Sequence, residues 1–453
     1  MQGLKEFILQ DAYIKKIQHC GAGLRIFLVG GTVRDILLGL NPTDYDFAVS
    51  GSGVSFARRI AQKLKGAFVL LSSKDDEARV VVNGVIFDFI GIGDGYIEDD
   101  LLRRDFTINA MAIDLKTHKF FDPCKGFKDL KRGILRVPGP RNLIDDPLRV
   151  LRGFRFSVEL GFRLDKTFYK QVPEVNLSDV APERIGFEIV KIMSAAKTFD
   201  TILKMNQLGI FRKLFPEARK LIDDFELWDH SLNTYQAIEF LMSGGFFTEL
   251  KPQFSEYFSK PRKKALVKLA GLFHDVAKPD TFLLKDGEIH FYGHDSIGAR
   301  VVEEMLNRRL RLSRDDIATV KRLVKEHMRL HLLATAPELT DRAIRRFFRD
   351  LGEDWLGAMM IAWADGYATG GRIKHLKEAF TRMIELKKAD EAKPKIKPLV
   401  NGYDLIDLGM TPGPKFKIIL QELFDLQLEG KLESKEQALK IAIKLNEEIS
   451  KET

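Results

Sequence analysis

The sequence predicts an α+β protein, in which a small mixed sheet near the N-terminus is followed by all-helical regions. Short apolar runs separated by glycine- and asparagine-containing turns between residues 26 and 90 are typical of strands. Beyond about residue 200, apolar residues recur at helical spacing without strand alternation. At 453 residues the chain exceeds one ordinary hydrophobic core. We expect a head, a neck, a body and a tail over residues 1–125, 126–200, 201–385 and 398–453.

The composition is that of a soluble globular protein, with 45% hydrophobic and 30% charged residues. No stretch approaches ~20 uninterrupted apolar residues, and the N-terminus lacks a signal-peptide pattern, so we expect no membrane segment. Cys20 and Cys124 are too few for a disulfide framework or a thiolate metal site, which favours a reducing, cytoplasmic location. The net charge of +8 mildly favours a polyanionic partner.

The first group of candidate functional residues follows a strand. Ile26–Val29 is predicted to be a buried strand, and Gly30 and Gly31 permit a tight turn where backbone approaches a ligand closely. Asp44 and Asp46 lie two residues apart in a second expected strand, so their carboxylates share one face. Such like charges repel each other, and bound magnesium, which prefers oxygen ligands, resolves the repulsion. We predict a metal-nucleotide site; the alternative is a Rossmann-like turn followed by two solvated aspartates.

A β-hairpin is the next strong signal, because Asn83-Gly84 lies between two apolar runs over residues 79–90. A helix over residues 55–64 and a strand over residues 68–71 are expected before it. Asp88 is flanked by apolar residues on the second hairpin strand. An isolated aspartate there is usually an edge or turn residue, but beside the paired aspartates it could be a third metal ligand.

After Asp88, the next candidate functional residues are Arg104, Asp105 and Asn109. They put a forked donor, an acceptor and an amide within about one helical turn of one another. That combination suits phosphates and ribose hydroxyls. The alternative for any one of these residues alone is an ordinary surface salt bridge with a helix cap.

A basic helix is expected next. Asp145-Asp146-Pro147 supplies a capping acid and a proline for the first helical turn. Arg149, Arg152 and Arg155 then recur every three residues along one side of the helix. A row of like charges destabilises a helix, so we expect an anion to bind there. The alternative is a solvated basic face.

Together these motifs resemble the nucleotidyltransferase superfamily that includes DNA polymerase β. Gly30-Gly31-x-x-Arg34-Asp35-x-x-Leu38-Gly39, followed by Asp44-x-Asp46, is most similar to class II tRNA nucleotidyltransferases and bacterial poly(A) polymerases. The resemblance implies that two Mg²⁺ ions bind at Asp44 and Asp46, with Asp88 as the third catalytic carboxylate. It also implies that the nucleotide is bound by Gly30, Gly31, Arg34, Arg104, Asp105 and Asn109.

The same resemblance gives the basic helix a role in choosing the base. Asp146 and Arg149 would read the Watson–Crick edge of CTP or ATP, and Arg152 and Arg155 would hold phosphates or shape the pocket. A carboxylate accepts from an exocyclic amine and an arginine donates to a ring nitrogen or carbonyl, so the chemistry is suitable. Glu183-Arg184 is expected to support this helix.

A second constellation of candidate ligands lies in the helical body. Its members are His230, His274, Asp275, His294, His327 and Asp365. Imidazole with carboxylate suits a transition metal or a binuclear site, although any one of these histidines is more often an ordinary core or surface residue. The order resembles the HD phosphohydrolase superfamily, which implies metal-dependent hydrolysis of phosphomonoesters or cyclic phosphodiesters. Lys278 is expected to be a surface lysine, and the alternative is that it aids phosphate binding.

The resemblance implies tRNA as the partner and CTP and/or ATP as substrates, with CMP and/or AMP added to the tRNA 3′ end. Residues 399–416 resemble the C-terminal element of these transferases, which helps to hold the tRNA elbow. Only a short stretch separates Asp88 from Arg103, where full CCA-adding relatives often carry a longer loop. C-addition alone is therefore the leading hypothesis. The alternatives are a poly(A) polymerase, and an HD phosphohydrolase with an RNA-binding head.

Overall fold

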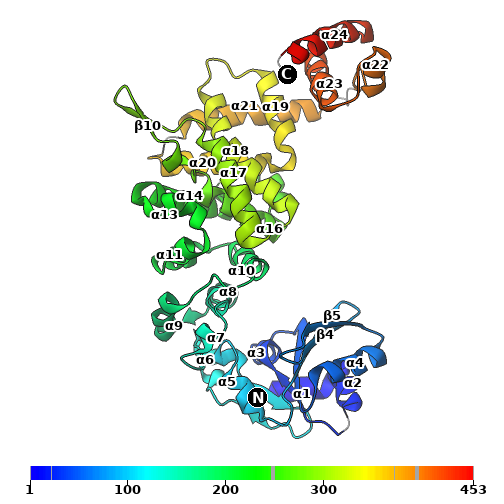
Figure 1. Cartoon of the computed structure of the whole chain (residues 1–453), viewed down its shortest axis with the longest axis vertical. Coiled ribbons are helices and arrows are strands. Elements are labelled where there is room, and N and C mark those ends of the chain that lie inside the picture. The colour runs from blue at the N-terminus through cyan, green and yellow to red at the C-terminus, as the bar shows by residue number, and fades with distance from the viewer. Residues whose placement is uncertain (1, 22, 246–249, 372, 393–396, 452–453) are drawn as a thin grey trace. The chain divides into compact units, whose positions relative to one another are not determined.

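The structure, a computed structural model, is α+β as predicted (Figure 1). It describes residues 2–21, 23–245, 250–371, 373–392 and 397–451. The chain falls into two compact units, Met1–Val324 and Lys325–Thr453. The four predicted regions are a finer division, which stays a prediction. Among the described residues, no helix combines the length and the apolar character needed to cross a membrane.

The head contains a seven-stranded mixed sheet with the strand order β3-β4-β5-β2-β1-β6-β7. Strands β2 and β5 run parallel, whereas the other neighbouring strands are antiparallel. The strands expected over residues 26–29 and 44–49, and the hairpin over 79–90, are confirmed. The bounds are β1 Ile26–Val29, β2 Asp44–Val49, β3 Ala67–Ser72, β4 Glu77–Val82, β5 Val85–Gly91, β6 Ala112–Asp114 and β7 Phe120–Phe121.

The sheet positions the candidate aspartates at the edge of the head core. Strand β1 is buried at every position, as expected for a strand covered on both faces. Strand β2 is exposed at Asp44 and becomes fully buried from Phe47 onward, so its first residues extend out of the core. The helices that cover the sheet are α1 Gln2–Gln10, α2 Ala12–Cys20, α3 Gly30–Leu37, α4 Gly53–Leu64 and α5 Ile97–Leu102.

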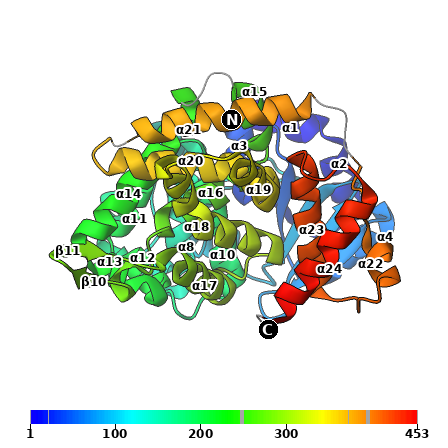
Figure 2. The same cartoon turned by 90° about the horizontal axis from the view of Figure 1, so that it is seen from above.

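The rest of the first unit is helical, as predicted, but it also holds two short ladders that sequence analysis missed. Strand β8 (Ile134–Leu135) pairs with β9 (Arg163–Leu164), and β10 (Leu283–Lys285) pairs with β11 (Glu288–His290), a hairpin that Figure 2 labels at the edge of the view. Strands this short show no alternation. The helices are α6 Gly126–Arg132, α7 Asn142–Asp145, α8 Arg149–Leu160, α9 Lys166–Gln171, α10 Pro182–Ser194, α11 Phe199–Gln207, α12 Ile210–Leu214, α13 Arg219–Asp223, α14 Phe225–Phe240, α15 Lys251–Tyr257, α16 Pro261–Phe273 and α17 His294–Met305.

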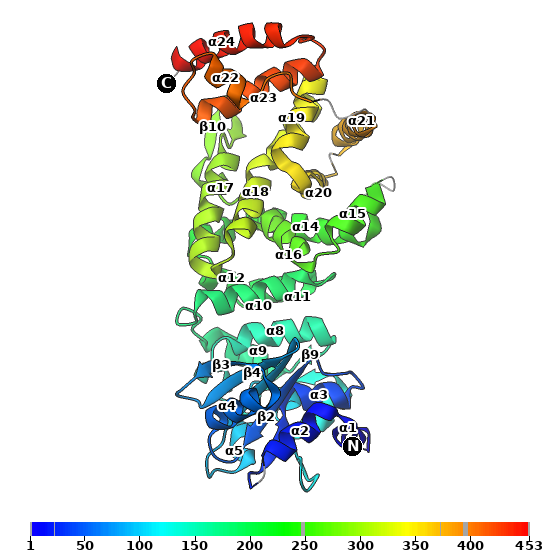
Figure 3. The same ribbon diagram turned by 90° about the vertical axis from the view of Figure 1, so that its right-hand side faces the viewer.

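The second unit is helical, and its last three helices have a hydrophobic core of their own. Figure 3 shows α22, α23 and α24 packed together, and Leu405, Ile419 and Ala442 are buried between them. The remaining helices are α18 Arg314–Thr335, which begins before the boundary between the units, α19 Asp341–Leu351, α20 Trp355–Ala368 and α21 Lys374–Glu391. The three packed helices are α22 Gly402–Asp407, α23 Pro414–Leu428 and α24 Lys435–Lys451.

A buried ion pair joins α14 and α16 to the segment that precedes α11. Lys268 Nζ donates to Glu239 Oε1 at 2.6 Å, to the Ala195 carbonyl at 2.7 Å and to Thr198 Oγ1 at 3.1 Å. Glu239 also accepts from the Thr198 backbone N–H at 2.7 Å. Burial lowers the pKa of Lys268, although Glu239 opposes the shift. The pair therefore fixes the junction through full hydrogen bonding rather than through charge alone.

Lys268→Met should lower the free energy of unfolding by about 3–5 kcal/mol, because it leaves Glu239 charged and buried without its cation. Denaturant unfolding at neutral pH measures this loss. The double variant Lys268→Met/Glu239→Gln should recover part of it, because the amide removes the unpaired charge and keeps an acceptor. A single variant as stable as the wild type would contradict this role of the pair.

Candidate active sites

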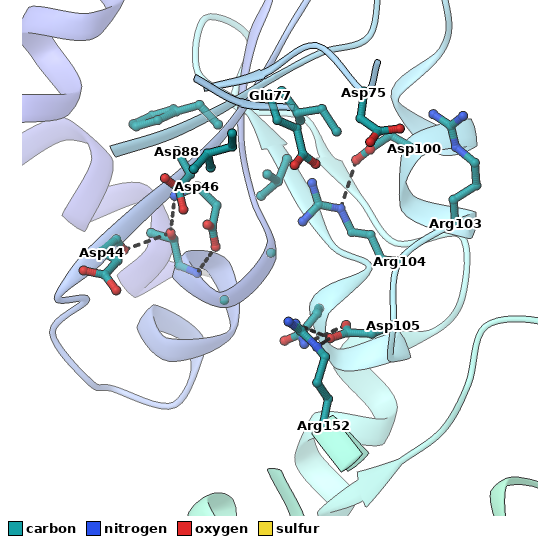
Figure 4. A pocket seen from close by; sticks show the side chains of 18 of the residues that line it. Asp44, Asp46, Asp75, Glu77, Asp88, Asp100, Arg103, Arg104, Asp105 and Arg152 are labelled. Carbon is teal, nitrogen blue, oxygen red and sulfur yellow. Dashed lines mark hydrogen bonds and ion pairs between the residues drawn. The ribbon is translucent and has the colours of Figure 1, made fainter. Parts of the chain in front are cut away.

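Asp44 and Asp46 lie on β2 and face the start of α3 (Figure 4). Thr32 holds both residues: its Oγ1 accepts from the Asp46 backbone N–H at 2.7 Å and donates to the Asp44 carbonyl at 3.2 Å. The Thr32 backbone N–H lies 3.4 Å from Asp46 Oδ2. Gly30 has φ +66°, and a Cβ there would lie 2.9 Å from Asp46 Oδ2. Glycine is therefore required where α3 meets the carboxylate.

Asp88 lies on β5 directly opposite Asp46 in the parallel register. Arg79, on β4, lies opposite Asp88 and donates from Nε to Oδ1 at 2.8 Å and from Nη2 to Oδ2 at 2.9 Å. Burial raises the pKa of Asp46; Arg104 opposes this shift and Asp88 adds to it. Carboxylates crowded in this way supply the oxygen donors that fit a hard divalent cation.

The Arg104 guanidinium lies beside Gly30, on the same side as the Asp46 carboxylate. A Cβ on Gly30 would lie 2.6 Å from Arg104 Nη1. Arg104 Nε donates to Asp100 Oδ2 at 2.9 Å, and Figure 4 shows Glu77 near the same guanidinium. Burial, followed by the charge of Asp75, raises the pKa of Glu77, although Arg104 lowers it. Arg104 is therefore a fixed cation beside the aspartates of β2 and β5.

A chain of hydrogen bonds connects α3 to α8. Arg34 Nη1 donates to Asn109 Oδ1 at 2.8 Å, and Asn109 Nδ2 donates to Asp105 Oδ1 at 2.9 Å. Arg152 then donates to Asp105 Oδ2 from Nε at 2.9 Å and from Nη2 at 2.5 Å. Burial raises the pKa of Asp105, but Arg152 and Asn109 outweigh it and the pKa falls to about 2. This chain joins three of the predicted nucleotide-binding segments.

The basic helix differs from the prediction at its start. Asp145 and Asp146 lie before α8, which begins at Arg149 with Leu148 at the N-cap. Asp146 Oδ1 accepts from the Leu148 backbone N–H at 3.3 Å, so it caps the preceding turn rather than the helix. The proline at 147 keeps the chain outside the helix at this point. The predicted helical cap is therefore wrong, although the arginine spacing is right.

The arginines of α8 already have anionic or carbonyl partners within the protein. Arg155 donates to Glu188 Oε2 at 2.6 Å and to Glu159 Oε2 at 2.7 Å. Arg149 donates to the carbonyls of Asn142 and Arg103, both at 2.8 Å. A solvated basic face is thus excluded for these side chains, and their guanidinium groups are held in place.

Every residue predicted for catalysis or nucleotide binding in the head lines one pocket of about 1210 Å³. These residues are Gly30, Gly31, Arg34, Asp44, Asp46, Asp88, Arg104, Asp105, Asn109, Asp146, Arg149, Arg152 and Arg155. Sequence analysis missed Thr32, Glu77 and Arg79. The two-residue Asn83-Gly84 turn could have revealed Arg79, because it fixes the hairpin register that places Arg79 opposite Asp88.

The first unit also gathers four of the predicted histidine and aspartate ligands. The ligand atoms of His230, His274 and Asp275 all lie within 4.8 Å of one another, and His294 Nε2 lies 3.4 Å from Asp275 Oδ1. The Nδ1 atoms of His274 and His294 lie 2.9 Å and 2.7 Å from the Gly271 and Phe291 carbonyls. These second contacts orient imidazoles as in protein metal sites, so the donors fit a transition metal.

One correction and one untested prediction concern the neighbours of these ligands. Lys278 is not a surface residue, because its Nζ lies 2.6 Å from Asp275 Oδ2 and only 20% of its side chain is exposed. His327 and Asp365 are buried in the second unit, on α18 and α20, and their role as ligands stays a prediction. His331 Nε2 lies 3.0 Å from Asp365 Oδ2, a pairing that sequence analysis missed.

Gly30→Ala should lower nucleotide incorporation by roughly 100-fold or more, because the methyl group would displace both Arg104 and Asp46. The initial rate with labelled CTP measures this effect. Gly39→Ala is the matched control: it shares the positive φ, at +77°, but its Cβ would meet nothing within 4 Å. Equal losses in the two variants would contradict the requirement for space at Gly30.

Three protein-family models match successive parts of the chain, in the order in which the motifs occur. The model for poly A polymerase head domains matches residues 26–92 and 94–136. The model for the probable RNA and SrmB-binding site of polymerase A matches residues 161–221, and the HD domain model matches residues 227–370. The aspartates of β2 and β5 and the histidine cluster thus fall within separate matched domains, and the arginines of α8 lie between two matches.

Two relatives match the chain over nearly its full length. The A-adding tRNA nucleotidyltransferase of Deinococcus radiodurans is 31% identical over 432 residues, which cover 91% of this chain and 93% of that protein. The CC-adding tRNA nucleotidyltransferase of Synechocystis is 30% identical over 425 residues, covering 92% and 93%. The Thermotoga maritima CCA-adding enzyme complexed with tRNA shares the fold, with TM-score 0.65, 21% identity and coverage of 98% and 97%. The chain therefore belongs to the tRNA nucleotidyltransferase family and carries an HD domain.

Proposed function

We propose that this protein adds nucleotides from CTP and/or ATP to the 3′ end of tRNA without a nucleic-acid template. The head pocket carries the proposal, because aspartates from β2 and β5 and arginines from two later segments line a single cavity. The relatives named as A-adding and CC-adding enzymes support it over nearly the whole chain. A poly(A) polymerase is the alternative, since it would share the motifs of the head.

Asp44 and Asp46, with Asp88 beside them, are proposed to hold Mg²⁺, whose preference for carboxylate oxygen suits this donor set. Two such ions would make the RNA 3′-hydroxyl more acidic and neutralise charge on the leaving pyrophosphate. Thr32 keeps Asp46 oriented through its backbone N–H. Arg104 places a fixed positive charge where the triphosphate would lie, so this part of the pocket needs no rearrangement.

The base is proposed to be chosen by Asp146 and Arg149. The carbonyls of Asn142 and Arg103 hold the Arg149 guanidinium, and Arg184 Nη2 lies 3.4 Å from Asp146 Oδ2. A carboxylate and a guanidinium held in this way present an acceptor and a donor to the base edge, as a template base would. Arg152 and Arg155 then act mainly by fixing the pocket wall.

C-addition alone is our leading hypothesis for the set of nucleotides added. The connection between β5, which ends at Gly91, and α5, which begins at Ile97, is short. A tRNA lacking its whole CCA end, incubated with CTP and ATP, tests this hypothesis. We expect two cytidines and no adenosine. A complete CCA product would refute C-addition alone, and long ATP-only tails would identify a poly(A) polymerase. Adenosine added only to a tRNA that already ends in CC would identify an A-adding enzyme. No incorporation into either tRNA would refute nucleotidyl transfer.

The histidine cluster supports a second activity, hydrolysis of phosphomonoesters or cyclic phosphodiesters at a transition-metal site. His230, His274 and His294 all direct Nε2 toward Asp275, and imidazole nitrogen suits a transition metal better than magnesium. A bound metal would supply hydroxide at neutral pH. Lys278 offers a cation at the same carboxylate, which would also favour a phosphate group.

Arg149→Ala should blur the choice between CTP and ATP more than it weakens binding of the triphosphate. The variant removes the donor aimed at the base and leaves Arg104 and Asp105 in place. We expect the ratio of kcat/KM values for CTP and ATP to change by about 10- to 100-fold, as for one lost bidentate contact. Unchanged selectivity would remove the base-reading assignment.

Asp44→Ala should abolish nucleotide incorporation and leave phosphoester hydrolysis intact. Asp275→Asn should have the opposite effect, because the two carboxylates belong to separate clusters of side chains. Incorporation into truncated tRNA and release of phosphate from nucleotide phosphomonoesters or cyclic phosphodiesters are the two measurements. If either variant lost both activities while remaining folded, the assignment of separate active sites would be wrong.

A further inference from the structure

Three charged side chains lie in a row across neighbouring strands of the head sheet. Arg79 on β4 is opposite Asp88 on β5, and Asp88 is opposite Asp46 on β2. Residues directly opposite each other in neighbouring strands share a face of the sheet. Asp46 and Asp88 line the head pocket, whereas Arg79 is not among the lining residues. Because β5 lies between β4 and β2, Arg79 and Asp46 flank Asp88 from opposite neighbouring strands.

The contact between Arg79 and Asp88 is a two-bond fork. Nε donates to Oδ1 at 2.8 Å and Nη2 donates to Oδ2 at 2.9 Å, so both carboxylate oxygens are engaged. An ionised carboxylate offers about four lone-pair sites, of which the fork occupies one on each oxygen. The planar fork also fixes the plane of the carboxylate. The carboxylate of Asp88, which lines the pocket, is thus held in a fixed orientation with lone pairs left for a further ligand.

Arg79 also makes the electrostatic potential at the aspartates of the pocket less negative. Its hydrogen bonds to Asp88 raise the pKa of the guanidinium, burial opposes them, and the charges of Asp88, Asp44 and Asp46 add to the rise. The same interactions mean that Arg79 offsets part of the negative potential of the three aspartates. A divalent cation therefore meets a less negative site than the aspartates alone would make.

We propose that Arg79 is a positioning residue for nucleotidyl transfer, which orients Asp88 through its fork and weakens the affinity of the pocket for divalent cations. This inference rests on the proposed transfer reaction. It predicts two effects of removing the arginine. Loss of the fork lowers the rate of nucleotidyl transfer, whereas loss of the positive charge raises the affinity for divalent cations. Loss of a merely structural contact would instead slow the reaction and weaken metal binding together.

Arg79→Met tests both consequences. We expect kcat for incorporation into truncated tRNA to fall by about 10- to 100-fold, the usual effect of removing a residue that orients a ligand. We also expect the half-saturating Mg²⁺ concentration to fall by on the order of threefold, because a nearby positive charge is removed. Titration calorimetry with Mg²⁺ alone measures the second effect without turnover, and histidine sites bind this ion poorly.

Arg79→Lys keeps the charge and loses the fork, so it should lower kcat and leave the Mg²⁺ dependence unchanged. In an Asp88→Asn background, Arg79→Met should lower kcat no further. Arg58→Met is the matched control: this exposed arginine stacks on Phe68, 4.5 Å from the ring centroid, and should have wild-type kinetics.

Wild-type kcat in Arg79→Met, or weaker Mg²⁺ binding in that variant, would overturn the inference. If Arg79→Met does not fold, a wild-type kcat in Arg79→Lys would overturn it as well. Failure of the wild-type protein to extend truncated tRNA would instead refute the proposed function itself, whatever the arginine variants do.

Discussion

The crowding of carboxylates on two parallel strands is the constraint on which the head depends. The register places Asp46 opposite Asp88, and Asp44 lies two residues before Asp46 on the same strand. Like charges this close destabilise a sheet unless something offsets them. Thr32 binds the backbone of both β2 aspartates, and Arg79 takes both oxygens of Asp88. The head thus keeps a negative pocket open for a cation, rather than filling it with its own side chains.

A chain of hydrogen bonds connects α8 to the other side chains of this pocket. Arg152 is bound to Asp105, which is bound to Asn109, which is bound to Arg34 on α3. Each guanidinium has protein partners, so its geometry is set before any substrate binds. Preorganised charges of this kind stabilise a transition state without the cost of reorganisation. The residues proposed to bind the triphosphate and those that fix the pocket wall therefore belong to one hydrogen-bonded network.

Local patterns predicted the fold and most of the head pocket, because strand alternation, an Asn-Gly turn and helical spacing are properties of neighbouring residues. The features that these patterns did not predict depend on contacts between residues that are distant in the sequence. Glu188 is the partner of Arg155, yet the two lie on separate helices, and no spacing in the sequence pairs them. Sequence analysis wrongly predicted a surface lysine at Lys278, because the ion pair of this residue with Asp275 depends on tertiary packing. The position of Arg79, by contrast, could have been predicted, because the Asn83-Gly84 turn fixes the hairpin register that places Arg79 opposite Asp88.

The relatives show that this chain is a transferase with an HD domain, and the proposed metal site of the transferase lies at the aspartates of β2 and β5. Electron paramagnetic resonance of the Asp275→Asn protein with Mn²⁺ and a non-hydrolysable CTP analogue tests that claim most directly, because the histidine cluster is then impaired. We expect a spin-coupled pair of Mn²⁺ ions about 4 Å apart. Replacing Asp46 by asparagine should abolish this coupling. A spectrum of isolated ions that Asp46→Asn leaves unchanged would contradict it.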